Sequence, residues 1–215
     1  MTQQLHRSAK DVAYEYVKGQ IIGPHLQEGV FLTEGQVAMA LGISRTPVRE
    51  AFLRLEAESL LTLVPQKGAF IPPISDREVQ EVMETRKVLE VYCGQRVARA
   101  GIDLSRPLST LLREQEQRSD DVEDFIDCDR RFHHHIVSTA GNRLLTKLYE
   151  SLRDRQLRMG IKAVVGDRGR AHQVIDEHRT IAEALESGDE GLVRRALEAH
   201  LDATLATLRR ERGPR

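Results

Sequence analysis

Four residues of the types that bind metal ions, Asp129, His133, His178 and His200, fall on apolar stripes of the sequence. Asp129 and His133 are four residues apart, so a helix places them on one face. The apolar residues that share these stripes, in chain order, are Phe125, Phe132, Ile136, Val174, Ile175, Ile181, Leu185, Val193, Ala196, Leu197 and Leu208. A buried carboxylate is costly unless it is paired or bound to a metal. One carboxylate and three neutral imidazoles from three helices suit a divalent ion with open positions for water or a ligand.

Each histidine, taken alone, also has a simpler explanation as a hydrogen-bonded core residue. His133, His134 and His135 are consecutive, and at about 100° per residue they cannot all face inward. We expect His134 on the polar side of its helix, and the spacing leaves His135 undecided. Spacing alone therefore leaves a metal site and a hydrogen-bonded core as alternatives.

Two further polar residues could contact a ligand. Arg86 lies among apolar residues of a predicted helix, and a buried guanidinium needs an anion. That anion is either Glu90, one turn away, or a ligand carboxylate held by a bidentate contact. Asn142 follows Gly141 and is a candidate for a second ligand contact, although capping of the next helix is its more usual role.

A second constellation suits nucleic acid and begins at Ser44. Three arginines and one glutamate between Ser44 and Arg54 give a local charge of +2 in a chain of net charge −1. Arg45 and Arg49 are one turn apart and share a helix face. Arginine can bind guanine through two donors, threonine such as Thr46 can contact a base or a phosphate, and a helix N-terminus favours phosphate. The alternative is a helical domain whose arginines only face solvent.

The elements around this constellation occur in the order of a winged helix-turn-helix. Helical spacing of Val12, Tyr16, Val17 and Ile21 predicts a helix over 8–22. Thr33 and Gln36 form a capping box for a helix over 33–41 that Gly42 ends. Ser44 caps a third helix that runs to about Ser59, with Pro47 in its first turn. Strands over 60–65 and 68–71 then form a hairpin with Gly68 at its tip. The third helix is the one expected to enter the major groove.

The two parts of the chain meet at Ile71-Pro72-Pro73-Ile74, since consecutive prolines stop regular structure. We expect a DNA-binding domain over 1–72 and a helical domain over 73–215. From Ser75 onward about six helices are predicted, separated near 101–105, 119–120, 141–142, 166–169 and 187–189. Short connections favour an antiparallel bundle, so the fold class is mainly α.

The composition of the 215-residue chain agrees with a helical globular protein. Aromatic residues make up 4% and Trp is absent, which argues against a β-sandwich. Cys93 and Cys128 form neither a CxxC pair nor a disulfide framework. No apolar run reaches the ~20 residues of a membrane span, and the first ten residues hold no signal-peptide core. We therefore expect a cytoplasmic protein with no membrane partner.

The segment Ile43-Ser44-Arg45-Thr46-Pro47-Val48-Arg49-Glu50-Ala51, with Leu55 and Leu60 after it, resembles the recognition-helix signature of GntR-family transcription regulators. The resemblance implies that Arg45, Thr46 and Arg49 contact DNA and that Gly68 of the wing enters the minor groove. Two positions depart from the family. Gly35 stands where the family often has arginine, and Ser59 stands where it usually has glycine, so a strained turn is expected there.

The later motifs Asp129-Arg130-Arg131-Phe132-His133 and Glu177-His178-Arg179, followed by His200, resemble the FCD effector domain of the FadR-type branch. Arg86-Lys87-Val88-Leu89-Glu90 also resembles a motif of that domain. The resemblance implies that Asp129, His133, His178 and His200 bind a divalent metal, commonly zinc, nickel or manganese. It also implies a small carboxylic acid effector.

The sequence thus predicts a ligand-responsive transcription regulator that binds a palindromic DNA operator as a homodimer. The family resemblance implies that it is a repressor released by a small carboxylate. One alternative is a metal-dependent enzyme acting on a small carboxylate. The metalloprotease motif HExxH is absent, however, and no nucleophile lies at a spacing from the histidines that is typical of a catalytic site. We therefore assign no catalytic residue. The other alternative is a DNA-binding module with a purely structural bundle.

Overall fold

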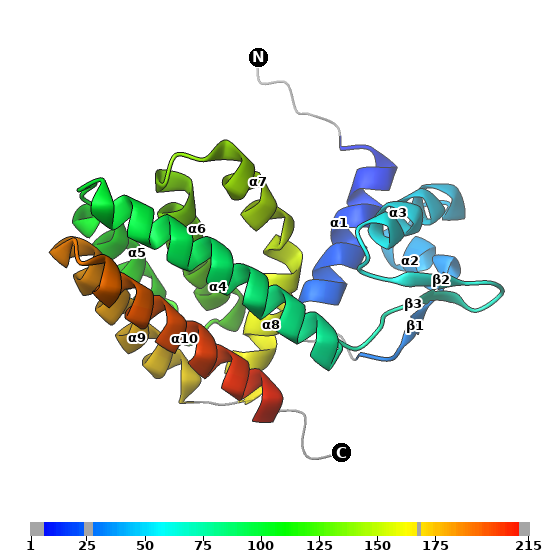
Figure 1. The fold of residues 1–215 in the computed structure, drawn as a ribbon. Helices are drawn as coiled ribbons and strands as arrows, with labels where there is room; N and C mark the ends of the chain where they lie inside the picture. The colour runs from blue at the N-terminus through cyan, green and yellow to red at the C-terminus, as the bar shows by residue number, and fades with distance from the viewer. Residues whose placement is uncertain (1–6, 24–27, 167–168, 211–215) are drawn as a thin grey trace. The chain divides into compact units, whose positions relative to one another are not determined.

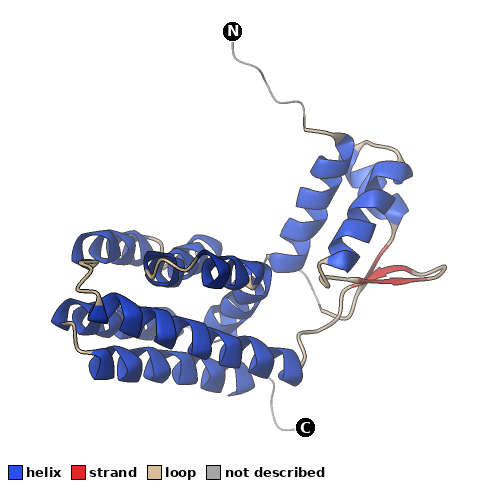
Figure 2. Ribbon diagram, turned by 45° about the horizontal axis from the view of Figure 1, so that its top comes forward, coloured by secondary structure: helices blue, strands red, loops and turns tan. Residues whose placement is uncertain are grey.

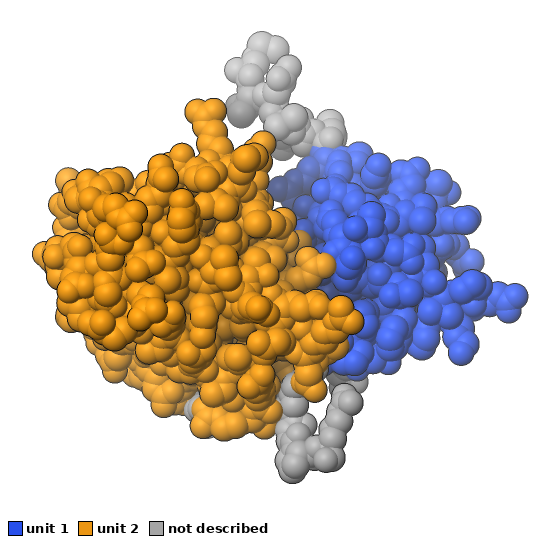
Figure 3. Space-filling model, viewed as in Figure 1, with its two compact units in different colours: residues 1–74 blue, residues 75–215 orange. Residues whose placement is uncertain are grey.

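The computed structural model describes residues 7–23, 28–166 and 169–210. The chain forms two compact units, Met1–Ile74 and Ser75–Arg215, and the division falls at the end of the segment 71–74. Figure 3 distinguishes the two units by colour. Strands occur in the first unit, while the described part of the second unit is helical (Figure 2).

Three helices form most of the first unit: α1 (Ala9–Ile22), α2 (Glu34–Leu41) and α3 (Arg45–Ala57). The predicted capping box of Thr33 and Gln36 is present, and Gly42 ends α2 in the left-handed region at φ +66°. Ser44 has the extended backbone of an N-cap, but its side chain makes no capping hydrogen bond, unlike the prediction. Ser59, after α3, has φ +60°, which places the expected strain at the predicted residue.

The wing is a three-stranded antiparallel sheet in the order β1-β3-β2, with β1 at Phe31–Leu32, β2 at Thr62–Val64 and β3 at Gly68–Phe70. The sequence did not predict β1, because two residues are too few to show strand alternation. The predicted place of Gly68 at the hairpin tip is wrong. The turn is formed by residues 65–67, and Gly68 pairs with Val64. A Cβ at Gly68 would lie 2.5 Å from the carbonyl oxygen of Leu32, so close packing of β1 on β3 requires glycine there.

The core of the first unit lies where α1 and α3 pack together. Val48, Phe52 and Leu55 of α3 are fully buried. On α1 the predicted residues Val17 and Ile21 are buried, but Val12 and Tyr16 are each 38% exposed. Ala13 and Tyr14 are buried in their place, so the buried face keeps Val17 and Ile21 but is turned from the predicted face by less than the ~100° of one residue.

The second unit contains seven helices in its described part (Figure 1). They are α4 (Asp76–Arg99), α5 (Ser105–Gln117), α6 (Val122–Thr139), α7 (Arg143–Ser151), α8 (Arg153–Gly166), α9 (Arg170–Ser187) and α10 (Glu190–Arg210). The prediction of about six helices missed the break between α7 and α8. Leu152 forms this break with φ −85° and ψ −6°, and neither glycine nor proline marks it in the sequence.

The long helices α4 and α10 lie side by side along the bundle (Figure 1). Gly94 permits this close approach, because a Cβ there would lie 2.8 Å from Leu197 Cδ1. Phe132 and Ile136 of α6 belong to the same apolar core. The predicted fold class, a winged helix-turn-helix followed by a helical bundle, is confirmed. No helix within 7–23, 28–166 and 169–210 is long and apolar enough to cross a membrane.

Candidate metal centre and DNA-reading helix

Helices α6, α9 and α10 bring the four predicted metal ligands together. One ligand atom from each of Asp129, His133, His178 and His200 lies within 4.8 Å of the others. His133 Nε2 is 3.0 Å from His178 Nε2, which is 3.3 Å from an Asp129 carboxylate oxygen. The three imidazoles are buried, and Asp129 is 18% exposed. The four residues could therefore hold one ion at a single point.

Each imidazole directs its Nδ1 away from this point and toward an oxygen of another side chain. His178 Nδ1 lies 2.9 Å from Gln115 Oε1, and His200 Nδ1 lies 2.7 Å from Glu177 Oε2. His133 Nδ1 lies 2.8 Å from Glu90 Oε2, but the two atoms are not aligned as a hydrogen bond. An acceptor at Nδ1 favours the proton there and leaves the Nε2 lone pair free. With its proton on Nδ1, His178 directs the Nε2 lone pair at His133 Nε2, where a cation or a proton between the two rings can accept it.

The protonation states also suit a metal. Burial lowers the pKa of His178 to about 3, although its contact with Asp129 opposes the shift. Burial likewise lowers the pKa of His200. For Asp129, burial raises the pKa, but the contact with His178 and the nearby positive charges hold it well below its usual value. At neutral pH the centre thus offers neutral imidazoles at His178 and His200 and an ionised carboxylate at Asp129, the forms that bind metals.

Arg86 and Glu90 form a buried ion pair beside the centre. Arg86 Nε donates to Glu90 Oε1 at 2.7 Å, and the Tyr149 hydroxyl donates to the same oxygen at 2.9 Å. Burial raises the pKa of Glu90, but Arg86 and His133 outweigh this effect and hold it well below its usual value. The i,i+4 pair that the sequence offered as one alternative is therefore present. Arg86 Nη2, however, is buried with no hydrogen-bond partner in the described part of the chain.

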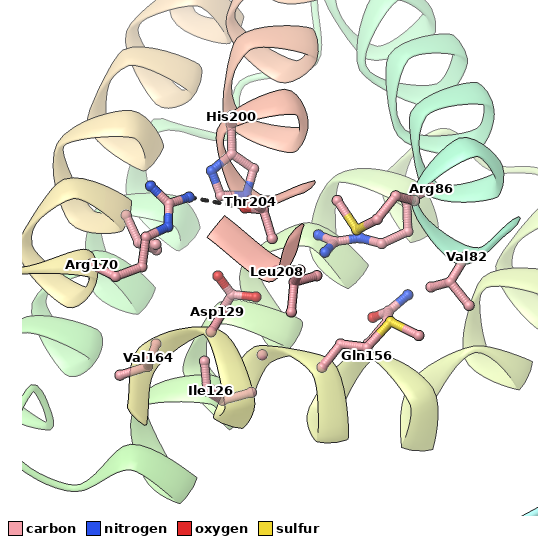
Figure 4. A pocket seen from close by; sticks show the side chains of 15 residues that line it. Val82, Arg86, Ile126, Asp129, Gln156, Val164, Arg170, His200, Thr204 and Leu208 are labelled. Carbon is pink, nitrogen blue, oxygen red and sulfur yellow. Dashed lines mark hydrogen bonds between the residues drawn. The ribbon is translucent and has the colours of Figure 1, made fainter. Parts of the chain in front are cut away.

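A pocket adjoins the centre (Figure 4). It is narrow and partly open to solvent, and Asp129 and His200 are among its walls. Arg86 also lines it. Arg170 lines it from α9, where its guanidinium donates to both oxygens of Glu177 at 2.6 and 2.8 Å and to Thr204 at 2.9 Å.

The structure does not place Asn142 at this pocket. Asn142 Oδ1 accepts hydrogen bonds from the backbone N–H groups of Leu144 and Leu145 and so caps α7. Asn142 is absent from the lining of the pocket. Its prediction as a ligand contact is therefore unsupported, and the capping alternative accounts for the residue.

The sequence did not predict the residues that contact the Nδ1 atoms of the histidines. Gln115 follows Leu108 and Leu112 at helical spacing and is 1% exposed, so a polar residue on an apolar stripe was a usable signal. Glu177 directly precedes His178 in the sequence, but nothing local indicates that it contacts His200. Arg170 follows a predicted helix break, where an arginine is expected to face solvent, and its burial has no local signal.

The proposed DNA-reading side chains lie at the start of α3. Arg45, Thr46 and Arg49 are all exposed there. The guanidinium of Arg45 lies over Gly35 of α2, with Nη2 3.5 Å from the position of an added Cβ. A side chain at Gly35, which departs from the family pattern, would therefore begin in ordinary van der Waals contact with Arg45.

Each of the two units matches a known family profile. The profile described as "Bacterial regulatory proteins, gntR family" matches residues 9–71, and that of the FCD domain matches residues 81–203. The chain is 24% identical over 201 residues to the gluconate operon transcriptional repressor of Bacillus subtilis (strain 168), covering 89% of this chain and 81% of that protein. It is 27% identical over 206 residues to the HTH-type transcriptional repressor RspR of Escherichia coli (strain K12), covering 93% and 88%.

Solved structures show the same fold. A GntR transcriptional regulator from Rhodococcus sp. RHA1 matches with a TM-score of 0.78 at 23% identity, covering 94% of this chain and 98% of that one. The metal-free FCD domain of TM0439 matches with a TM-score of 0.52 at 24% identity, covering 65% of this chain and 96% of that one.

The two profiles, one for each unit, define a DNA-binding transcriptional regulator. The chain belongs to the GntR family and carries a C-terminal FCD domain. The alternative of a metal-dependent enzyme is overturned, because the relatives and the similar folds are transcriptional regulators rather than enzymes.

Proposed function

We propose that this regulator is a repressor that leaves its operator when a small carboxylate binds beside a divalent metal in the second unit. The observation that carries the proposal is the convergence of Asp129, His133, His178 and His200 at the wall of a pocket. A divalent ion held there supplies positive charge and open coordination positions for a carboxylate. Imidazole and carboxylate ligands suit zinc, nickel or manganese.

The DNA-binding part of the proposal assigns the operator contacts to Arg45, Thr46 and Arg49 on the exposed start of α3. A homodimer on a palindromic operator follows from the way such helices read two half-sites. Gly68 allows β1 to pack closely against β3 and lies next to the turn of residues 65–67. We therefore assign the minor-groove contact mainly to that turn. Relatives named as repressors in Bacillus subtilis and Escherichia coli favour repression over activation. A protein with this function works in the cytoplasm.

The metal is tested by elemental analysis of the purified protein. We expect about one divalent ion per chain. His178→Ala and His200→Ala lower both the metal content and the melting temperature, since metal binding to the folded state stabilises it. His134→Ala is the matched control, because His134 contacts Glu150 at 3.1 Å outside the centre. Absence of metal, together with unchanged melting after chelation, would remove the site.

A further inference from the structure

Two buried hydrogen-bond donors of the pocket have no partner. Arg86 of α4 is 6% exposed and Gln156 of α8 is 8% exposed, and both line the pocket. Arg86 Nη2 and Gln156 Nε2 make no hydrogen bond within the described residues. Buried donors are nearly always paired in folded proteins, so each unpaired one calls for an explanation. A ligand with two separate acceptor groups would satisfy both.

The charges around the pocket are otherwise balanced within the chain. Arg86 is paired with Glu90, and Arg170 with Glu177. A divalent ion beside the single carboxylate of Asp129 then leaves one net positive charge. A buried charge is stable only when it is paired, so a ligand with one negative charge fits this pocket better than one with two.

Most of the remaining lining is apolar. The side chains that form these walls include Val82, Met83, Ile126, Met159, Val164 and Leu208. A ligand rich in hydroxyl groups would lose hydrogen bonds to water without regaining them against these walls. An aliphatic body is therefore favoured over a polyhydroxylated one.

We propose that the effector is a monocarboxylate with an aliphatic body and one neutral acceptor group, whose carboxylate accepts from Arg86 Nη2 and whose neutral acceptor accepts from Gln156 Nε2. Gln156 is then the residue that selects among carboxylates. This inference rests on the proposed function, because it specifies the ligand of the same pocket.

The test is calorimetry on the full-length, metal-loaded chain with three kinds of acid, each in a five-carbon and a six-carbon form. Pentanoate and hexanoate have no second acceptor, 4-oxopentanoate and 5-oxohexanoate add a keto group, and pentanedioate and hexanedioate add a second charge. We expect at least one oxo acid to bind about tenfold more tightly than its parent acid, as a buried hydrogen bond allows. We expect both dicarboxylates to bind more weakly than the matched parent acids.

Two variants assign the preference to Gln156. Gln156→Leu is expected to abolish the advantage of the oxo acid over its parent acid. Gln173→Leu, on an exposed position of α9, is expected to keep the advantage. Unchanged metal content in both variants reports an intact second unit, and Gln156→Met makes the same test if the leucine variant does not fold.

The outcomes separate this inference from the proposed function. Parent acids that bind as tightly as every oxo acid, or dicarboxylates that bind most tightly, would overturn the inference and leave a carboxylate regulator in place. An oxo-acid advantage that survives in Gln156→Leu would also overturn it. If no carboxylate binds to the metal-loaded chain, both the inference and the carboxylate part of the proposed function fail.

Discussion

Gln115 connects α5 to the candidate metal centre through one side-chain contact. Its Oε1 lies 2.9 Å from His178 Nδ1, and the residue is buried. An acceptor in this place fixes the imidazole tautomer that leaves Nε2 for a metal. The positions of the histidine rings thus depend on residues that are not themselves ligands.

We predict that Gln115→Leu weakens zinc binding by about 10- to 100-fold, the usual effect of losing an outer partner of a ligating histidine. Competition with a chromophoric chelator measures the affinity. Gln117→Leu is the control, because Gln117 lies on the same helix but is exposed. Wild-type affinity in Gln115→Leu would mean that the contact does not orient His178 for metal binding.

The backbone conformation of Ser59 lowers the stability of the folded protein. Its φ of +60° lies in the left-handed region, where a Cβ is unfavourable and glycine is not. We predict that Ser59→Gly raises the free energy of unfolding by about 0.5–1 kcal/mol, after allowance for the greater chain entropy of glycine. Ser59→Ala keeps the Cβ and is expected to give no such gain in a denaturant titration. A destabilised glycine variant would contradict this account.

At this scale the sequence predicted which side chains face inward but not which atoms meet them. Helical periodicity alone places Asp129, His133, His178 and His200 on buried faces, because each lies at regular spacing from large apolar residues. Their outer partners come from other positions in the bundle, such as Glu90 on α4. Those contacts depend on how helices pack, which local spacing does not encode.

Among the elements, α3 combines a structural and a functional role. Its buried residues Val48, Phe52 and Leu55 fix it in the core, while Arg45 and Arg49 remain exposed on its first turns. In the proposed function, a helix held in this way presents its N-terminal side chains to DNA without losing its packing.

We predict that Arg45→Ala and Arg49→Ala each weaken operator binding by about 1–3 kcal/mol, the range for loss of a bidentate contact to a base. Gel-shift titration against an operator selected from random DNA measures the effect. Arg113→Ala, an exposed substitution in the second unit, serves as the control. If both α3 variants bind like the wild type, α3 is not the reading helix.

Element boundaries were predictable where a capping residue marks them. Thr33, Gly42 and Ser75 each stand at a predicted helix end and are found at one. The break at Leu152 was not predictable, because a residue with high helix propensity forms it. Gly68 was predicted to lie in a turn because glycine is common in turns. The structure shows that glycine is needed there because β1 approaches closely.

For the whole molecule, the account needs the two units to influence each other. A carboxylate bound in the second unit can change operator affinity only if it favours one arrangement of the DNA-binding units over another. Such a coupling is reciprocal, so operator DNA must change carboxylate affinity by the same factor. The proposed repressor requires that each ligand weakens binding of the other.

A titration of operator DNA measures this coupling. Metal-loaded protein is titrated against its selected operator with and without a saturating concentration of the carboxylate that binds most tightly by calorimetry. We expect the carboxylate to weaken operator binding about 5- to 150-fold, the usual range for allosteric coupling. A carboxylate that binds tightly in the second unit and leaves operator affinity unchanged would contradict it.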